Sequence, residues 1–416
     1  ARGSTVRMYG YDSQQQLCRS EEPETGTTLY AYDAAGNLTG SAAGLPAGTA
    51  CGTPNTRTVS RGYAARNRLV VLQFPDGNGD QSWTYTPDGL PAVVTTANGG
   101  ASVTNTYSYN RRRLLTAETM TPDTELPLRT LGYGYDRQGQ VVVETYPDAA
   151  TVRHTRNALG QVTAITTQLD GGAEQPTVST ARYYPNGALA QFTYGNGIVH
   201  TMTQNARQLP ARSTDGAVLD LGLAYDGNGN VVAITDGTPG GRQTRSLGYD
   251  GLDRLVTATS PMFGAAAYAY DAQDNLMRVQ VTGGRQPRDH YYCYNARNQL
   301  EFVRSGPDCN GSPAVVALGY DAQGNLAFKN GSTYGFDDGN RLRSAAGQAY
   351  RYDAQGRRVR SDVGGAQRRY SLYAQDGRLL WQRDEVAGTR SVNVYLAGSL
   401  VAEVRRPLVG TTASVG

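Results

Sequence analysis

Hydrophobic and polar residues alternate with a period of two along most of the chain. Tyr30 and Tyr32 flank Ala31 before a polar turn, and Leu38 follows that turn among polar neighbours. Such alternation places the apolar side chains on one face of an extended strand. Glycine and turn residues interrupt every stretch before three helical turns could form. The pattern therefore predicts antiparallel β-hairpins throughout the chain.

The hairpin pattern returns as a short phrase. An aromatic residue is followed by Asp or Asn, by two or three variable residues that include Gly or Asn, and by an aliphatic residue about six positions after the aromatic. Examples are "YDAAGNL" at Tyr32, "YDGNGNV" at Tyr225 and "YDAQGNL" at Tyr320. About 18 copies lie between Tyr11 and Tyr395, roughly 23 residues apart. We expect residues 1–416 to form a single continuous array.

Each phrase contains the residues that a tight turn needs. The Asp carboxylate can accept hydrogen bonds from nearby backbone amides, and a glycine three positions later can adopt the left-handed conformation that closes a type I turn with a bulge. We therefore predict a structural role for ten turn residues: Asp33, Gly36, Asp136, Gly139, Asp226, Gly229, Asp321, Gly324, Asp353 and Gly356.

The number of strands limits the possible architectures. Two strands per repeat give about 36 strands, and a flat strip of that width would leave its apolar face uncovered. A barrel closed in a single turn from so many strands would have a lumen too wide for side chains to fill. The predicted fold class is therefore all-β, with antiparallel β-hairpin repeats in a spiralling sheet that forms a hollow shell.

The four cysteines form two close groups, Cys18 with Cys51 and Cys293 with Cys309. Their even number and local grouping fit two disulfides and an oxidising compartment. Buried reduced thiols are the alternative reading. The spacing does not match a zinc site, so we expect no metal.

The charge pattern argues against nucleic acid as a partner. The net charge is +3, and 38 of the 39 basic residues are Arg, spread among acidic residues along the whole chain. Nucleic-acid binding requires a clustered basic face. No apolar run approaches the roughly 20 residues that span a bilayer, so no membrane span is expected.

The residues that could perform catalysis are few. The three histidines, His154, His200 and His290, lie in separate repeats without a catalytic motif, and we expect them to be exposed on strands or loops. Eight Asp residues occupy the same turn position, so one structural cause accounts for all eight: Asp12, Asp33, Asp136, Asp226, Asp250, Asp271, Asp321 and Asp353. "DGNGDQ" at Asp76 resembles half of a calcium loop but lacks the distal Glu, so a hairpin turn is favoured. The sequence therefore predicts a protein that is not an enzyme and needs no cofactor.

The repeated phrases, "YDAQGRRVRS" at Tyr352 and the long run from Tyr370 to Arg406 resemble the YD-repeat, or RHS-repeat, proteins. That family includes bacterial Rhs polymorphic toxins, many of them type VI secretion effectors, the B and C components of insecticidal toxin complexes, and the teneurins. The resemblance implies a β-sheet shell around a C-terminal toxin, with residues 370–406 as the last shell repeats before an RHS-associated core.

The chain departs from this family pattern in two ways. It has no Asp-Pro dipeptide, which the self-cleavage motif of the bacterial members contains, and it has neither an initiator Met nor a signal peptide. We therefore expect a fragment of a longer protein that is secreted by, or displayed on, a bacterium. The expected partners are the C-terminal toxin cargo of the parent polypeptide, a secretion-system spike or delivery module, and further copies of the chain through its bare strand ends.

A cell-surface or extracellular carbohydrate-binding protein is the alternative function. Outward-facing aromatic residues such as Trp83 or Trp381, with neighbouring tyrosines, could stack on sugar rings, which makes glycans a second class of partner. The tyrosines alternate in register with the aliphatic residues, as expected for a buried or inward-facing side. That register favours the shell.

Overall fold

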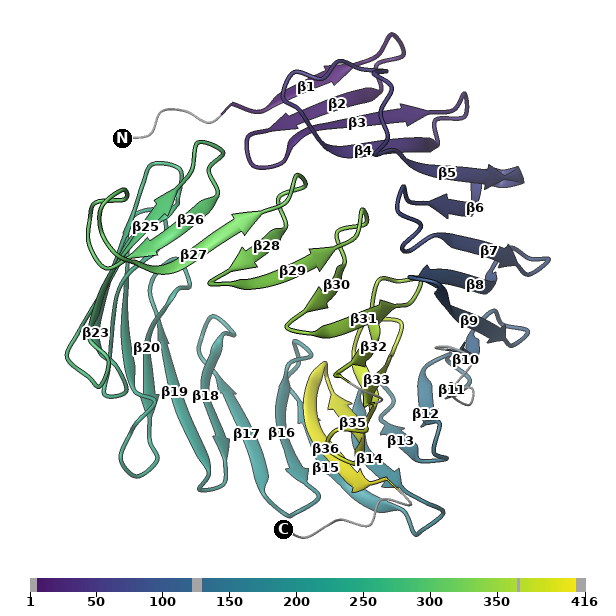
Figure 1. The fold of residues 1–416 in the computed structure, drawn as a ribbon. Coiled ribbons are helices and arrows are strands. Elements are labelled where there is room, and N and C mark those ends of the chain that lie inside the picture. Colours follow the sequence, from purple (N-terminus) through teal and green to yellow (C-terminus); the bar gives the residue numbers. More distant parts are fainter. Residues whose placement is uncertain (1–5, 122–128, 365–366, 409–416) are drawn as a thin grey trace. The chain divides into compact units, whose positions relative to one another are not determined.

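The computed structural model describes residues 6–121, 129–364 and 367–408. In these ranges the chain forms 36 β-strands and one short 3₁₀ helix, η1 (Ala65–Asn67), and it has no α-helix. Consecutive strands pair in antiparallel fashion, for example β3 with β4 and β23 with β24. Figure 1 shows these strands following one another along the chain. The all-β fold of antiparallel hairpin repeats is therefore confirmed.

The strands are short and follow one another at regular intervals. The first thirteen are β1 (Met8–Tyr11), β2 (Leu17–Glu22), β3 (Gly26–Tyr32), β4 (Leu38–Leu45), β5 (Val59–Ala64), β6 (Arg68–Gln73), β7 (Gln81–Tyr85), β8 (Pro91–Asn98), β9 (Ala101–Tyr109), β10 (Leu115–Thr121), β11 (Arg129–Tyr135), β12 (Val141–Thr145) and β13 (Thr151–Arg156). The next twelve are β14 (Val162–Gln168), β15 (Gln175–Tyr183), β16 (Leu189–Tyr194), β17 (Val199–Gln204), β18 (Pro210–Asp215), β19 (Leu219–Tyr225), β20 (Val231–Asp236), β21 (Arg245–Tyr249), β22 (Leu255–Ser260), β23 (Gly264–Tyr270), β24 (Leu276–Thr282) and β25 (Arg288–Tyr294). The last eleven are β26 (Leu300–Arg304), β27 (Ala314–Tyr320), β28 (Leu326–Lys329), β29 (Ser332–Phe336), β30 (Leu342–Ala345), β31 (Gln348–Tyr352), β32 (Arg358–Asp362), β33 (Arg368–Tyr373), β34 (Leu379–Asp384), β35 (Thr389–Leu396) and β36 (Ser399–Pro407).

A β-bulge marks the aromatic residue that opens most phrases. The pairing register shifts between Ala31 and Tyr32, between Gly134 and Tyr135, and between Ala269 and Tyr270. The extra residue lets the strand enter a tight turn and increases the local twist of the sheet. The repeat therefore builds its own curvature into each hairpin.

The chain divides into two compact units. The smaller contains residues 155–166 and 175–318, and the larger contains residues 6–154, 167–174 and 319–416 apart from the undescribed segments. The larger unit therefore brings together the beginning and the end of the sequence. The expectation that residues 1–416 form one continuous array stays a prediction.

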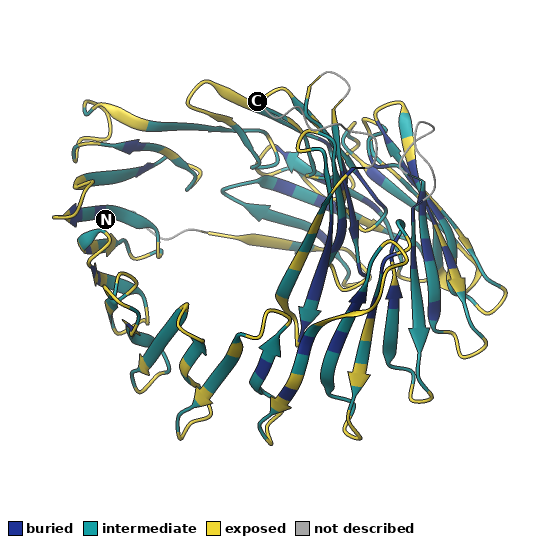
Figure 2. Ribbon diagram, turned by 90° about the horizontal axis from the view of Figure 1, so that it is seen from below, coloured by how far each residue is buried: buried dark blue, intermediate teal, exposed yellow. Residues whose placement is uncertain are grey.

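Burial differs between the strands of the larger unit. In β9 only alternate residues are buried, among them Val103, Asn105 and Tyr107. In β35 four consecutive residues, from Ser391 to Val394, are buried. A strand with both side-chain directions buried is covered on both faces. Strand β35 is therefore covered on both sides, and Figure 2 shows buried residues along the strands and exposed residues at the hairpin ends.

Candidate functional site

The candidate site is the contact between β8–β10 and the turn that joins β31 to β32, which we call the closure contact. All of it lies in the larger unit, and β31 runs close to β8 in Figure 1. Its central residue is Asn98, which is 5% exposed. The Asn98 side-chain amide donates to the carbonyl of Tyr352 (2.9 Å), and its Oδ1 accepts from the Tyr352 backbone N–H (2.8 Å). One side chain thus pairs both backbone groups of a residue more than 250 positions away.

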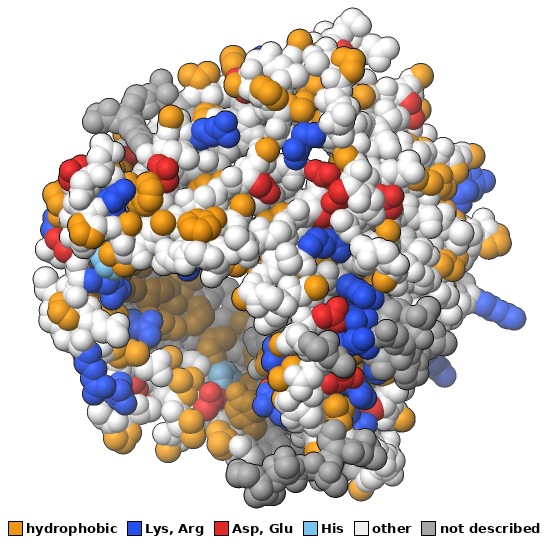
Figure 3. Space-filling model, in the orientation of Figure 1, with side chains coloured by type: hydrophobic (Ala, Val, Ile, Leu, Met, Phe, Trp, Pro, Cys, Tyr) orange, Lys and Arg blue, Asp and Glu red, His pale blue; other side chains and the backbone are white. Residues whose placement is uncertain are grey.

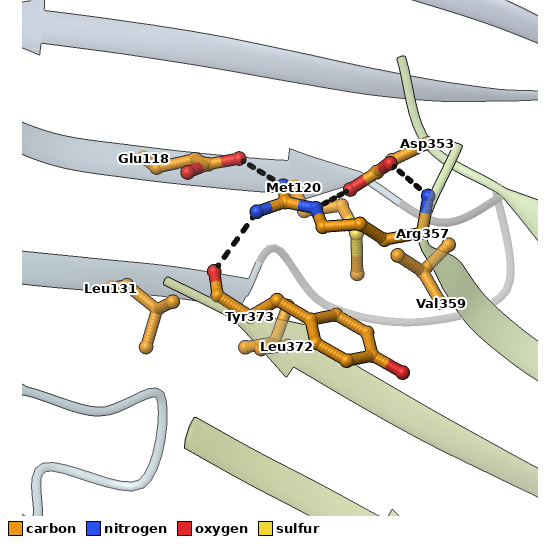
Figure 4. A pocket seen from close by; sticks show the side chains of 8 residues that line it. All are labelled: Glu118, Met120, Leu131, Asp353, Arg357, Val359, Leu372 and Tyr373. Carbon is orange, nitrogen blue, oxygen red and sulfur yellow. Dashed lines mark hydrogen bonds and ion pairs between the residues drawn. The ribbon is translucent and has the colours of Figure 1, made fainter. Parts of the chain in front are cut away.

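A buried ion-pair network lies beside Asn98. Arg357 Nε donates to Asp353 Oδ2 (2.6 Å), and Arg357 Nη2 donates to Glu118 Oε1 (3.1 Å). Asn105 Nδ2 donates to the same Glu118 oxygen (2.9 Å). Figure 4 shows the Arg357 guanidinium between the two carboxylates, which come from β10 and from the β31–β32 turn. Removing one partner of such a buried pair costs about 3–5 kcal/mol, because an unpaired charge remains.

The network shifts the pKa values of its members. Burial raises the pKa of Glu118 and of Asp353, and Arg357 only partly opposes this effect. Burial would lower the pKa of Arg357, but the carboxylates of Asp353 and Glu118 outweigh burial and raise it. A cavity of about 10 Å³, roughly the size of one water molecule, adjoins the group. The cavity is too small for a substrate, so these charges can position strands but have no room to perform chemistry on a ligand.

Further polar bonds extend the closure contact on both sides. Gln81 Nε2 donates to the carbonyl of Ala354 (2.9 Å), and Gln355 Nε2 donates to the hydroxyl of Tyr107 (2.6 Å). Arg343 Nη1 donates to Asn98 Oδ1 (2.6 Å). The turn of one hairpin therefore rests on the strands of other hairpins through directional side-chain bonds. Such bonds fix one register, whereas apolar contact alone would allow sliding.

The ten predicted turn residues lie in five hairpin turns, which join β3 to β4, β11 to β12, β19 to β20, β27 to β28 and β31 to β32. Asp33 Oδ1 accepts from the backbone N–H groups of Ala35 and Asn37, both at 2.9 Å. The five glycines have φ between +74° and +97°, where a Cβ atom causes strain. Asp353 and Gly356 belong to the closure contact, and the other eight residues do not. The contribution of these ten residues to the stability of the fold stays a prediction.

The sequence pattern did not reveal a ladder of tyrosine hydroxyls. The tyrosine that opens a phrase donates its hydroxyl to a backbone carbonyl of the preceding repeat, usually at the first residue after that repeat's turn. The donors and acceptors are Tyr63 to Leu38, Tyr85 to Leu69, Tyr135 to Leu115, Tyr183 to Val162, Tyr225 to Pro210, Tyr249 to Val231, Tyr270 to Leu255, Tyr294 to Leu276, Tyr352 to Leu342, Tyr373 to Arg358 and Tyr395 to Leu379. The sequence nevertheless contains a signal for these hydroxyl bonds, because Tyr and not Phe occupies nearly every copy of the position that opens a phrase.

A second ladder joins the turns themselves, and we call it the turn ladder. Asn275 Nδ2 donates to Asp271 Oδ2 in its own turn (3.0 Å) and to Asn298 Oδ1 in the next turn (2.9 Å). Asn230 bridges Asp226 and Asp253 in the same way. Asp253 and Asn298 occupy the position that is Gly in other phrases and have positive φ. Asp or Asn therefore replaces Gly where an acceptor for the preceding repeat is required.

The four cysteines form two disulfides in the structure, Cys18 with Cys51 and Cys293 with Cys309. The first closes a loop of the larger unit and the second a loop of the smaller unit. Each cross-links residues that are close in sequence, 33 and 16 positions apart. Closing such loops restricts the unfolded chain and thereby stabilises the folded state.

Two expectations about exposed residues are wrong. Trp381 is 2% exposed, so it cannot stack on a sugar ring, whereas Trp83 is half-buried and packs against the core cluster of Val94 and Tyr107. The histidines are half-buried: His154 lies 3.6 Å from Glu144 and His200 lies 2.7 Å from Asp215. Both errors have one cause, because neighbouring strands cover side chains that a single hairpin would leave in water.

The carboxylates near Asp76 participate in loop hydrogen bonds. Asp76 Oδ2 accepts from Asn78 Nδ2 and from the backbone N–H of Asp338, and Asp80 Oδ1 accepts from the N–H of Phe74. Among the described residues, no group of three or more His, Cys, Asp or Glu side chains is arranged to hold a metal ion. In the same ranges the structure holds no helix with the length and hydrophobicity that a membrane crossing requires.

The profile of the RHS Repeat family matches residues 225–261, which contain β20, β21 and β22 with the hairpin turns before β20 and between β21 and β22. Residues 225–261 therefore carry an RHS repeat. The resemblance inferred from the recurring phrases is thereby confirmed, and the phrases outside this segment follow the same pattern of turn, bulge and tyrosine hydrogen bond.

Two curated relatives match parts of this RHS-repeat chain. Double-stranded DNA deaminase toxin A of Burkholderia cenocepacia (strain H111) is 30% identical over 152 residues, which are 34% of this chain and 10% of the relative. Probable deoxyribonuclease RhsB of Dickeya dadantii (strain 3937) is 26% identical over 304 residues, which are 64% of this chain and 20% of the relative. The RHS-repeat chain therefore corresponds to a fifth or less of the length of these proteins.

Solved structures share the fold across nearly the whole chain. The crystal structure of TcdB2-TccC3 has a TM-score of 0.74 and 16% identity, and covers 96% of this chain and 23% of that one. The Photorhabdus luminescens Tc holotoxin pore has a TM-score of 0.64 and 14% identity, and covers 97% of this chain and 21% of that one. At such low identity the likeness concerns the fold alone, which supports the RHS-repeat arrangement of strands.

Proposed function

We propose that this RHS-repeat chain is a non-catalytic scaffold, a section of a shell that encloses and protects a C-terminal toxin of a longer, secreted bacterial protein. One relative is named as a double-stranded DNA deaminase toxin, and the other as a probable deoxyribonuclease, RhsB. This chain matches at most a fifth of their length. We infer that its role in such a protein is containment, while the toxic activity belongs to another segment.

The closure contact is the observation that carries this proposal. A strip of hairpins can serve as a wall only if hairpins that are distant in sequence seal against one another. Asn98 and Glu118 on one side and Tyr352, Asp353 and Arg357 on the other make such a seal, and all five are buried or half-buried. Their bonds connect residues about 240 to 250 positions apart. A covered seam of this kind denies a protease access to what lies behind it.

The chemistry of the closure contact favours a structural role over a catalytic one. Asp353 is fully buried, and its carboxylate accepts bonds from Arg357 and from two backbone N–H groups. Glu118 shares Arg357 and is bonded to Asn105. A general acid or base must reach a substrate proton directly or through one water. These carboxylates face guanidinium and amide groups of their own chain instead.

The test uses the longer natural polypeptide that contains this chain. The segment that follows Gly416 is exposed to protease in three forms: within the natural polypeptide, within an Asn98→Ala variant, and expressed alone. We expect the segment to survive only in the first form. Asn230→Ala is the matched control, because it removes an asparagine of the turn ladder in the smaller unit and leaves the closure contact intact.

Equal cleavage of the segment in the natural polypeptide and alone would overturn the proposal. If Asn98→Ala does not fold, Gln355→Ala replaces it, since that change removes two hydrogen bonds at the edge of the closure contact, one to the Tyr107 hydroxyl and one from Arg357. Circular dichroism, measured before digestion, shows whether a variant has unfolded globally or has only opened at the closure contact. The control variant must protect the segment as well as the natural protein does.

A further inference from the structure

A cavity in the larger unit combines charged residues with no role in the closure contact. It has a volume of about 160 Å³ and is lined by Arg129, Pro147, Asp148, Trp381, Arg383, Arg390 and Leu408. These residues come from the start of β11, the loop between β12 and β13, strands β34 and β35, and the position directly after β36. Three guanidinium groups thus converge on one space that is large enough for a small ligand.

Arg129 is the most unusual residue of this cavity. It is 6% exposed, and its guanidinium carbon lies 4.8 Å from the centre of the Trp381 ring and 5.4 Å from that of Tyr370. Its Nε and Nη2 atoms are buried without a hydrogen-bond acceptor. Burial lowers its pKa, and Arg383 lowers it further. A buried cation with unpaired donors is costly unless something supplies the missing acceptors.

Hydrogen-bond donors outnumber acceptors on the residues around the cavity. Besides Arg129, Arg390 Nε and Trp381 Nε1 are buried donors without a partner. The one unpartnered acceptor among the described lining side chains is Asp148 Oδ1. Buried donors in native proteins are almost always paired. The excess of donors indicates a ligand that offers several acceptor oxygens.

The charge balance indicates the same kind of ligand. Arg390 pairs with Asp148 (3.4 Å) and with Asp170 (2.7 Å), Arg406 also pairs with Asp170, and Arg383 pairs with Glu385 (3.1 Å). Four guanidinium groups, including Arg129, therefore face three carboxylates. One positive charge remains uncompensated, and it is the charge of Arg129, the most buried of the four arginines.

We propose that this cavity is an oxyanion site, which binds a carboxylate or phosphate group through Arg129 with help from Arg390 and Trp381. Guanidinium groups bind both kinds of oxyanion in bidentate fashion, and stacking on Trp381 holds the Arg129 plane in position. The indole N–H adds a neutral donor. This inference stands apart from the containment function, because the cavity shares no residue with the closure contact.

The chain offers a simple optical probe of the site. It contains two tryptophans, so a Trp83→Phe variant leaves Trp381 as the sole indole, stacked against Arg129. This variant of the full chain is titrated with inorganic phosphate and, separately, with acetate, at an ionic strength held constant with sodium chloride. We expect a saturable change in Trp381 emission with at least one of the two anions. Phosphate alone indicates a phosphoryl ligand, and acetate a carboxylate.

Arg129→Gln in the same background should weaken the response at least tenfold. Arg304→Gln is the matched control: Arg304 is half-buried and, like Arg129, has a buried Nε without a partner, but it lies in the smaller unit and contacts Phe302 and Ser312. The control should keep the full response. The proposal fails if neither anion gives a saturable change, or if Arg129→Gln and Arg304→Gln respond alike.

A second measurement covers the case in which Arg129→Gln does not fold. Phosphate or acetate should raise the melting temperature of the natural chain more than chloride at the same ionic strength, because a ligand that binds only the folded state stabilises it. Arg383→Gln, at the same cavity, should reduce this shift, and Arg304→Gln should not. Equal melting temperatures in all three salts would exclude the site.

Discussion

Two tyrosines of the larger unit, Tyr133 and Tyr146, have buried hydroxyl groups in different surroundings. The hydroxyl of Tyr133 is buried without a hydrogen-bond partner, whereas the hydroxyl of Tyr146 meets Glu144 Oε2 at 3.2 Å. Both rings belong to well-packed surroundings, with Tyr133 against the cluster of Val94 and Tyr107. A buried hydroxyl that lacks a partner has lost its bonds to water without compensation. The same chemical group therefore has opposite effects on stability at the two positions.

The matched substitutions Tyr133→Phe and Tyr146→Phe test this difference. Tyr133→Phe should leave the free energy of unfolding unchanged or raise it by about 1 kcal/mol, because it removes an unsatisfied hydroxyl. Tyr146→Phe should lower it by about 1–2 kcal/mol, because Glu144 loses a donor in a buried place. Urea unfolding followed by tryptophan fluorescence measures both. Equal effects of the two substitutions would contradict the assignment of their hydroxyls.

For single residues, the sequence predicted the local backbone geometry better than it predicted how deeply each side chain is buried. The Asp and Gly positions of the phrase are turn positions because local hydrogen bonding and the left-handed backbone depend on near neighbours alone. The burial of Asp353 and Trp381 depends on strands that are far away in the chain. No pattern within a single phrase carries that information, so the closure contact and the oxyanion site could not be found from it.

At the scale of the hairpin, the turn ladder explains why some phrases lack glycine. Asp253 accepts from the side chains of both Asn228 (2.8 Å) and Asn230 (2.7 Å) of the preceding turn, while its φ is +60°. Asp and Asn tolerate this backbone region better than other residues with a side chain. Each such position therefore balances backbone strain against a bond to its neighbour.

Three substitutions at Asp253 separate strain from hydrogen bonding. Asp253→Ala should destabilise the chain by about 1–2 kcal/mol, because it keeps the strain and loses the acceptor. Asp253→Gly loses the acceptor but relieves the strain, so it should cost less than Asp253→Ala. Asp253→Asn should change little, because it keeps an acceptor oxygen. Thermal unfolding provides the measurement, and an Ala variant as stable as the Asn variant would refute the ladder.

The turn ladder could have been read from the sequence. Phrases with Asn at the sixth position precede phrases with Asp or Asn at the fifth, as in "YDGNGNV" followed by "YDGLDRL". Two positions in neighbouring repeats thus vary together within one chain. The number of strands and their antiparallel pairing also followed from the pattern, because hairpins form between segments that are adjacent in sequence.

For the whole molecule, buried tyrosines set the limit of stability at high pH. Burial raises the pKa of Tyr107, Tyr133 and Tyr146 above the usual value near 10, and nearby glutamates raise it further. Each of these groups contributes stability that is complete below about pH 10. That stability is lost as the pH rises towards the folded-state pKa, because the unfolded chain releases its protons first.

The melting temperature should therefore be nearly constant from pH 8 to 9.5 and fall steeply above pH 10. Above pH 10, each of the three tyrosines lowers the free energy of unfolding by about 1.4 kcal/mol per pH unit. Tyr133→Phe should reduce the pH dependence above pH 10 by the contribution of one tyrosine. The melting temperature should still be nearly constant from pH 8 to 9.5 in this variant. Calorimetry at pH 8 to 11.5 measures this dependence, and a slope unaffected by Tyr133→Phe would contradict it.

The ladder of tyrosine hydroxyls has a mechanical consequence. Where the opening tyrosine makes this bond, a hairpin is joined to the preceding one twice, by the backbone bonds of paired strands and by the tyrosine hydroxyl on a carbonyl. A force applied at one end then detaches one repeat at a time, and each detached repeat releases roughly 80 Å of extended chain, since a repeat has about 23 residues of about 3.5 Å. The disulfides shorten that release for the two repeats that they close. Under force, such a chain therefore unfolds from an end in steps of similar length.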